Sequence, residues 1–226
     1  MTYNFTEIEK TLLDYIDFER ISEERVNSDN FGEYLDWDEI DMCWNVSAGA
    51  TKMCFIPKDD EKQYVIKVPF NADVEWNCEE EEYFSFYNAV YPLDHERGWD
   101  YCKSEVQYFE LAAQAGLDDF FAETMYLATR ADYPIYIQER CVFEQEKPKK
   151  EYYDLAEKLA QEDRRYYYMT QRFVAYLLTM YSARQIEDLL SFLSNEDIGD
   201  LNESNCGFAV EFGYRPVLTD YAGYWE

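Results

Sequence analysis

The sequence predicts an α+β protein in which a half rich in antiparallel strands comes before a helical half. Three apolar runs between residues 42 and 70 have the length and composition of strands. From residue 151 to 194, apolar side chains recur at helical spacing. Between these regions, residues 144–150 are polar and contain a proline, which is typical of a boundary. We therefore expect one part at residues 1–143 and a second at residues 144–226.

The first part is expected to begin with a helix and to continue with the three strands. The helix has one apolar face, which is formed by Ile8, Leu12, Leu13 and Ile16. Residues 57–62 are polar and predict a hairpin loop. Residues 65–68 read as a buried strand with a single lysine, Lys67. Upstream, residues 46–52 lie between two apolar runs and contain Gly49, as a hairpin would.

The rest of the first part predicts an insertion, a helix and a strand. Residues 71–100 are acidic and aromatic and form the insertion. Residues 104–113 have a helical pattern, and Gly116 marks its end. Residues 134–142 read as a strand that runs into the boundary segment.

The second part carries apolar residues on helical faces along most of its length. The first of these faces contain Tyr153, Leu155, Leu159, Phe173, Tyr176, Leu177, Met180 and Tyr181. The last face contains Ile186, Leu189, Leu190 and Leu193 and leads into the C-terminal segment. The three tyrosines at 166–168 could stack on bases, but their position beside apolar residues favours an edge of the core.

The C-terminal segment contains the residues that point most directly to chemistry. Asp200 is followed five positions later by Asn205, and Asp220 follows a short apolar run. Phosphoryl transfer uses such a set, in which one carboxylate orients the attacking hydroxyl while an amide and a second carboxylate hold Mg²⁺. Each residue taken alone is typical of a surface or a turn in an acidic chain.

These motifs resemble those of the protein-kinase-like superfamily. The run Gly-Asp-Leu-x-x-x-x-Asn at 199–205 is similar to its catalytic loop, in a form closer to the aminoglycoside phosphotransferases, with Ile198 where the family usually has His. The run Asp-Tyr-Ala-Gly at 220–223 resembles the metal-binding Asp-Phe-Gly segment with one inserted residue. The resemblance implies that Asp200 is the catalytic base, and that Asn205 and Asp220 bind the metal.

The first part resembles the same superfamily in the same order. Residues 65–68 are similar to its Val-Ala-Ile-Lys strand, which implies that Lys67 binds the α- and β-phosphates of ATP. The resemblance implies that a helix glutamate pairs with this lysine, with Glu105 as the first candidate and Glu110 as the second. It also places Gly49 in a flap over the phosphates, where Lys52 could add a positive contact. The adenine-binding hinge then lies near Glu139 and Cys141.

Five matches in collinear order favour the fold of this superfamily over coincidence. We expect two lobes, of which the first has an antiparallel sheet plus a helix and the second is a reduced helical lobe. The chain ends six residues after Asp220, where the family normally continues through several more helices. We therefore expect the acceptor-binding half to be missing or improvised. For single matches the plainer readings are an edge-strand lysine that reaches the surface and a solvated glutamate.

Composition limits the compartment and the kinds of site. The 226 residues include 19% aromatics, which argues against disorder, and there is no run of eighteen apolar residues. The N-terminus lacks a basic region followed by an apolar one, so we expect no secretory signal. Six cysteines at irregular spacing and a single histidine make a zinc site improbable. A cytoplasmic protein with reduced, mostly buried thiols is the expectation.

The net charge of −28 limits the partners. It argues against direct contact with nucleic acid, because phosphate contacts need clustered Lys and Arg, and against an anionic membrane surface. Solubility or the ionic conditions of the host would explain it simply. Attraction to a basic partner, including a nucleic-acid-binding protein, is the more specific explanation.

The sequence therefore leads to one main expectation of function and to alternatives. The main one is an ATP- and Mg²⁺-dependent phosphotransferase of protein-kinase-like type, whose acceptor the sequence does not name. The first alternative is a degenerate kinase fold that acts as an interaction or inhibitor protein, with an acidic surface that binds a basic partner. A second alternative is an unrelated α+β domain in which the motifs are coincidental.

Overall fold

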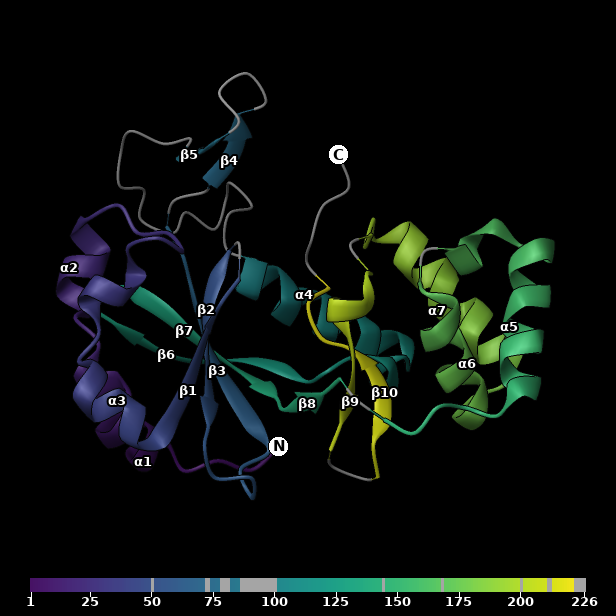
Figure 1. The fold of residues 1–226 in the computed structure, drawn as a ribbon, viewed down its shortest axis with the longest axis horizontal. Coiled ribbons are helices and arrows are strands. Elements are labelled where there is room, and N and C mark those ends of the chain that lie inside the picture. The colour runs from purple at the N-terminus through teal and green to yellow at the C-terminus, as the bar shows by residue number, and fades with distance from the viewer. Residues whose placement is uncertain are drawn as a thin grey trace. The chain divides into compact units, whose positions relative to one another are not determined.

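The chain divides into two compact units (Figure 1). The computed structural model describes residues 1–49, 51–71, 74–77, 82–85, 101–143, 145–167, 169–199, 201–210 and 213–221. The first unit contains Met1–Val106 and Thr124–Glu139, and the second contains Gln107–Glu123 and Arg140–Glu226. The predicted α+β class is confirmed, since the fold combines antiparallel sheets with seven α-helices among the described residues.

The centre of the first unit is an antiparallel sheet of five strands. Its order is β1 (Trp44–Ala48), β2 (Lys52–Pro57), β3 (Tyr64–Pro69), β7 (Tyr133–Glu139) and β6 (Thr124–Arg130). The three strands predicted between residues 42 and 70 are confirmed, and β3, which carries Lys67, lies in the middle of the sheet. The strand predicted at 134–142 is divided at Arg140 into β7 and a two-residue strand, β8 (Cys141–Val142).

Short helices cover one face of this sheet (Figure 1). They are α1 (Phe5–Thr11), α2 (Phe18–Glu23) and α3 (Trp37–Cys43), with 3-10 turns η1 (Leu13–Tyr15) and η2 (Phe31–Tyr34). The predicted apolar face is buried in full, with Ile8, Leu12, Leu13 and Ile16 in one cluster. The α-helix is shorter than predicted, because α1 ends at Thr11 and a 3-10 turn follows. Leu12, Leu13 and Ile16 therefore lie outside it.

Successive side chains along a strand point to opposite faces of the sheet. One face of this sheet is therefore apolar, whereas the other carries buried polar side chains. On β3, Ile66 and Val68 join the apolar cluster with the helices, whereas Lys67 projects to the opposite face. Every residue of β7 is buried, so both faces of that strand are covered. The face without the apolar cluster holds buried polar side chains, among them Lys52 and Gln138.

One helix and a small separate sheet complete the elements between β3 and β7. The helix is α4 (Tyr101–Ala115), and Gly116, at φ +71°, follows it as predicted. The separate sheet pairs β4 (Val74–Asn77) with β5 (Glu82–Ser85). Most of the predicted insertion at 71–100 lies outside the described residues.

The second unit combines three helices with a three-stranded antiparallel sheet. The helices are α5 (Lys150–Glu162), α6 (Gln171–Met180) and α7 (Ala183–Asn195), which confirms the helical region expected at 151–194. The sheet has the order β10 (Arg215–Leu218), β9 (Cys206–Ala209) and β8. Three 3-10 turns accompany them, η3 (Asp118–Phe120), η4 (Arg164–Tyr167) and η5 (Glu203–Asn205). Among the described helices, none is long and apolar enough to cross a membrane.

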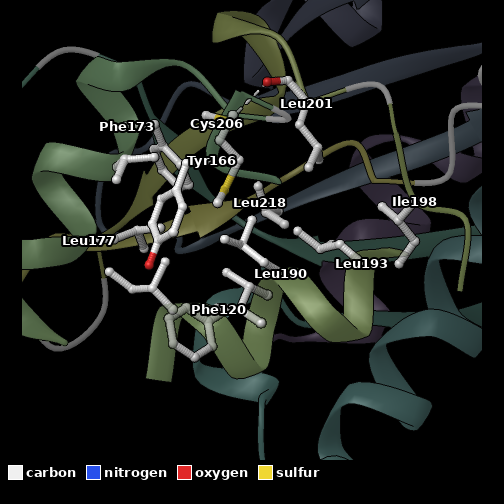
Figure 2. Packing of buried hydrophobic residues seen from close by; sticks show 14 of the residues in the cluster. Phe120, Tyr166, Phe173, Leu177, Leu190, Leu193, Ile198, Leu201, Cys206 and Leu218 are labelled. Carbon is white, nitrogen blue, oxygen red and sulfur yellow. Dashed lines mark hydrogen bonds between the residues drawn. The ribbon is translucent and has the colours of Figure 1, made fainter. Parts of the chain in front are cut away.

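A continuous apolar core holds the second unit together (Figure 2). Helix α7 begins with a capping box between Ser182 and Gln185 and buries its predicted face of Ile186, Leu189, Leu190 and Leu193. Ile198 and Leu201 lie in the same core, each 3% exposed. Two described residues between α7 and β9 are therefore anchored in the core of the second unit.

Tyr166 also belongs to this core, into which it brings a polar hydroxyl group. Its side chain is 1% exposed, and its hydroxyl has no hydrogen-bond partner in the described part of the chain. Burial raises the pKa of this phenol, and Glu187 and Asp163 add to the shift. The tyrosine run is therefore core at Tyr166, as expected; nothing is described for Tyr168 or for the side chain of Tyr167.

We expect Tyr166→Phe to raise the free energy of unfolding by about 1 kcal/mol, because it removes a buried hydroxyl that makes no hydrogen bond. The matched control is Tyr221→Phe. The Tyr221 hydroxyl is also buried but donates to the carbonyl of Ala122 at 3.0 Å, so its loss should cost about 1 kcal/mol. Urea unfolding measures both, and equal losses in the two variants would contradict this description of the core.

Candidate functional site

A cluster of buried polar side chains lies on the polar face of the first unit's sheet. We call it the Glu105 cluster, and its members are Lys52, Lys67, Glu105, Thr124 and Gln138. Lys67 Nζ lies 2.7 Å from Glu105 Oε2, and Lys52 Nζ lies 2.8 Å from Glu105 Oε1. Gln138 Nε2 donates to Glu105 Oε2 at 3.0 Å and to Thr124 Oγ1 at 2.7 Å.

The register of the sheet brings these residues together. Lys67 on β3 lies opposite Cys54 on β2, so Lys52, two residues before Cys54, projects from the same face. Thr124 and Gln138 are direct partners on β6 and β7 and project to this face as well. Glu105 lies in the first half of α4 and reaches the cluster from the helix.

Burial makes the charges of this cluster interdependent. Glu105 is fully buried, and the two lysine side chains are 5% exposed or less. A buried carboxylate is tolerated in a protein only when its charge is compensated and its lone pairs are hydrogen-bonded. Here each carboxylate oxygen accepts from a different lysine, and Gln138 adds a third hydrogen bond.

The cluster decides between alternatives that the sequence left open. Lys67 is not an edge-strand lysine, because it lies on the middle strand and is 4% exposed. Its helix partner is Glu105, while Glu110 is exposed on the same helix. Lys52, expected as a contact for phosphates, forms an ion pair with Glu105 that the sequence did not reveal. The catalytic roles of Lys67 and Glu105 remain predictions.

Gly49 lies where the predicted flap would place it, just after β1. Its backbone N–H donates to the carbonyl of Lys52 at 2.9 Å across the hairpin. A Cβ added at Gly49 would meet only that carbonyl, at 3.6 Å, which is an ordinary contact. Packing within the described residues therefore does not require glycine here, and binding of phosphate by this hairpin remains a prediction.

In the second unit, the two predicted metal ligands lie at one end of the β9–β10 hairpin. Asn205 directly precedes β9, and Asp220 follows β10 by one intervening residue, Thr219. The Thr219 N–H donates to the Asn205 carbonyl at 2.9 Å, which holds the two ends together. Asn205 is 7% exposed and Asp220 is half-buried. Asp200 lies outside the described residues, as do positions 222 and 223 of the predicted metal-binding segment.

The described part of the chain contains no group of three or more His, Cys, Asp or Glu side chains arranged to hold a metal ion. The predicted metal set is of another composition, since it combines an amide oxygen from Asn205 with a carboxylate from Asp220. Hard cations such as Mg²⁺ prefer oxygen ligands, and one or two carboxylates with substrate phosphates suffice to bind them. The donor types therefore fit Mg²⁺, and binding remains a prediction.

The predicted adenine hinge falls at a transition between the two units. Glu139 is the last residue of β7 in the first unit, and Cys141 begins β8 in the second, opposite Ala209. A Cβ at Gly207 would lie 3.1 Å from Cys141 Cβ and 3.1 Å from Thr219 Cγ2. Gly207 therefore allows close packing between β8 and β9, a role that the sequence analysis missed because it depends on strand pairing.

The cysteine next to Asn205 is a packing residue. Cys206 is 6% exposed and lies in the apolar core of the second unit (Figure 2). Burial, with a smaller contribution from Glu203, raises the pKa of its thiol to about 12. Since the thiolate is the nucleophilic form, Cys206 offers no nucleophile at neutral pH. The expectation of mostly buried thiols holds for Cys206 and Cys102, whereas Cys43 is exposed.

Comparison with family models, with curated proteins and with solved structures gave no match to this chain.

We expect Glu105→Gln to lower the free energy of unfolding by about 3–5 kcal/mol, because it leaves two buried ammonium groups without their shared carboxylate. Glu110→Gln is the matched control, since Glu110 is exposed on the same helix and its change should stay within about 0.5 kcal/mol. Urea unfolding at neutral pH measures both. A Glu105→Gln variant as stable as the control would contradict the buried ion pairs.

Proposed function

We propose that this protein is an ATP- and Mg²⁺-dependent phosphotransferase of protein-kinase-like type. The observation that supports it best is the buried ion pair between Lys67 and Glu105. Such a pair is expensive to bury, and replacing it by apolar side chains would often be as stable. The position of this ion pair on the polar face of the sheet is therefore better explained by a role in binding a ligand than by a contribution to stability.

The charge balance of the chain strengthens this argument. The protein has 20 Lys and Arg against 48 Asp and Glu, so cations are scarce. Lysines are seldom buried unless they are paired, yet two of them meet at one carboxylate here. In the proposed reaction Lys67 contacts the α- and β-phosphates of ATP, and Glu105 holds its ammonium group in position.

The second unit would supply the metal ligands and the base. Asn205 and Asp220 would hold Mg²⁺, which offsets the negative charge of the phosphates when it is bound. Asp200 would accept the proton from the acceptor hydroxyl while that oxygen forms a bond to the γ-phosphorus. The bond from the γ-phosphorus to the β–γ bridging oxygen breaks, and ADP leaves. The proposal requires that one nucleotide engages both sets of residues.

Nucleotide binding can be tested by thermal unfolding. We expect ATP with Mg²⁺ to raise the melting temperature of the wild-type protein, because a ligand that binds only the folded state stabilises it by roughly 2.7 kcal/mol at a hundredfold excess over Kd. The increase should require Mg²⁺ and should be lost in Asp220→Ala, which lacks a metal ligand. Asp188→Ala, which removes an exposed carboxylate on α7, should keep the full increase.

Two results would count against the proposal. No shift of the wild-type protein at millimolar ATP and Mg²⁺ would rule out the nucleotide site. A shift that Asp220→Ala and Asp188→Ala retain equally would show that Asp220 has no part in it.

A second candidate function, an interaction protein that binds a basic partner, is favoured by a groove on the first unit. The groove has a volume of about 690 Å³ and is lined by Asp14, Tyr15, Ile16, Asp17, Glu33, Tyr34, Leu35, Asp36, Trp37 and Asp38. Its five carboxylates form no ion pair within the described part of the chain. Trp37 is 42% exposed, and aromatic rings beside carboxylates attract the cationic side chains of Lys and Arg.

For this candidate we expect an oligo-arginine peptide to bind, with an affinity that falls steeply between 50 and 500 mM salt, since exposed charges are screened. Neutralising Asp14, Glu33 and Asp38 together as amides should weaken binding by about tenfold or more, a loss of about 1.4 kcal/mol. The matched control neutralises three exposed acids elsewhere, Glu151, Glu157 and Asp188. Equal weakening in both variants, measured by fluorescence anisotropy, would mean that only net charge matters and that the groove is no docking site.

A further inference from the structure

Gln138 connects Glu105 to the strand next to its own through its side-chain amide. The amide Nε2 donates to Glu105 Oε2 at 3.0 Å and to Thr124 Oγ1 at 2.7 Å. A carboxylate oxygen only accepts hydrogen bonds, so the amide must present its nitrogen rather than its oxygen to Glu105. The two hydrogens of one planar amide group therefore point to acceptors on two different elements, α4 and β6.

Thr124 holds this amide from a rigid position. It is the direct partner of Gln138 in the pairing of β6 with β7, and the two residues are 1% and 3% exposed. A β-branched side chain has few rotamers available to it, and the pairing of the strands fixes its backbone. The direction of the Gln138 amide is therefore determined by the sheet itself.

The carboxylate of Glu105 gains a fixed orientation from this contact. The last torsion of a glutamate side chain has a broad preference, so its oxygens can turn. A lysine ammonium lies at the end of a flexible four-carbon stem, so it can follow a carboxylate that moves. A planar amide that is bound at a second point cannot follow it. The oxygen that accepts from Gln138 is also the one that lies 2.7 Å from Lys67 Nζ.

We propose that Gln138 is a positioning residue for Lys67, and that it acts by fixing the Glu105 oxygen to which the lysine is bound. Thr124 acts one step further away, because it orients Gln138. This inference rests on the proposed function, in which the ion pair between Lys67 and Glu105 stays intact and holds the ammonium group at the phosphates of ATP. Gln138 also directly precedes Glu139, where the adenine is predicted to bind, so β7 would help to place both ends of the nucleotide.

A contribution to stability alone explains the Thr124–Gln138 pair less well. Replacing both partners of a buried neutral hydrogen bond by apolar groups of the same shape is nearly neutral for stability. An apolar pair cannot, however, supply a directed donor to the Glu105 carboxylate. Accurate placement matters in the proposed reaction, because a displacement of about 1 Å in a reacting group can cost on the order of a hundredfold in rate.

The test measures the Kd of ATP with Mg²⁺ by calorimetry, and thermal unfolding of each variant checks that it is folded. Thr124→Val removes the acceptor with little change of shape and should weaken binding about threefold or more. Thr124→Ser keeps the hydroxyl and should bind within about twofold of the wild-type protein. The matched control, Thr129→Val, makes the same change at an exposed position of β6 and should leave Kd unchanged.

The proposed order of action predicts that the effect of Thr124 depends on Gln138. Gln138→Met removes the donor and should weaken binding about fivefold or more, because the hydrogen bond to the charged carboxylate is the stronger of the two. In that background Thr124→Val should cause no further loss, since the amide that it orients is gone. If Thr124→Val weakens binding by the same factor in both backgrounds, the two residues act independently and the inference is overturned.

The outcomes separate this inference from the proposed function. If Gln138→Met and Thr124→Val bind ATP with Mg²⁺ as tightly as the wild-type protein and only their melting temperatures fall, both residues are merely structural. The inference is then wrong, while the proposed function stands. If the wild-type protein binds no nucleotide, the proposed function is wrong and the inference fails with it.

Discussion

The fully buried carboxylate of Glu105 is the constraint on which the first unit depends. It ties α4 to the polar face of the sheet, because its oxygens are held by side chains from β2, β3 and β7. The opposite face of the same strands is an ordinary apolar core with α1, α2 and α3. A sheet between an apolar layer and a charged buried cluster has little freedom of register, since a shift by one residue would place lysines in the apolar core.

The second unit holds polar residues at one end of the β9–β10 hairpin. Its apolar core reaches into the segment between α7 and β9 through Ile198 and Leu201. The β9–β10 pairing then brings Asn205 and the residue before Asp220 into hydrogen-bond contact. Gly207 completes this arrangement, because any side chain there would push β9 away from Cys141 and Thr219. Packing of the core and the pairing of β9 with β10 therefore determine where Asn205 and Asp220 lie.

Net charge and local charge lead to different conclusions in this protein. A net charge of −28 by itself indicates an acidic surface, and the groove beside Trp37 is part of that surface. The net charge of the chain does not reveal the two buried lysines, Lys52 and Lys67. The two groups of charges act at different ranges, because the exposed carboxylates set the field around the protein whereas the buried lysines interact mainly with the groups that touch them.

Local patterns in the sequence determined the element types: apolar runs predicted β1 to β3, helical spacing predicted α5 to α7, and Gly116 marked the end of α4. The resemblance to the protein-kinase-like superfamily, rather than any local pattern, suggested that Lys67 pairs with Glu105. The sequence alone left Glu110 as a rival, left Lys52 as a phosphate contact and gave no role to Gly207. Those points depend on which strands pair, in which register, and which side of a helix is covered. Such contacts join residues far apart in the chain, between Lys52 and Glu105 or between Gly207 and Cys141, and only the tertiary structure decides them.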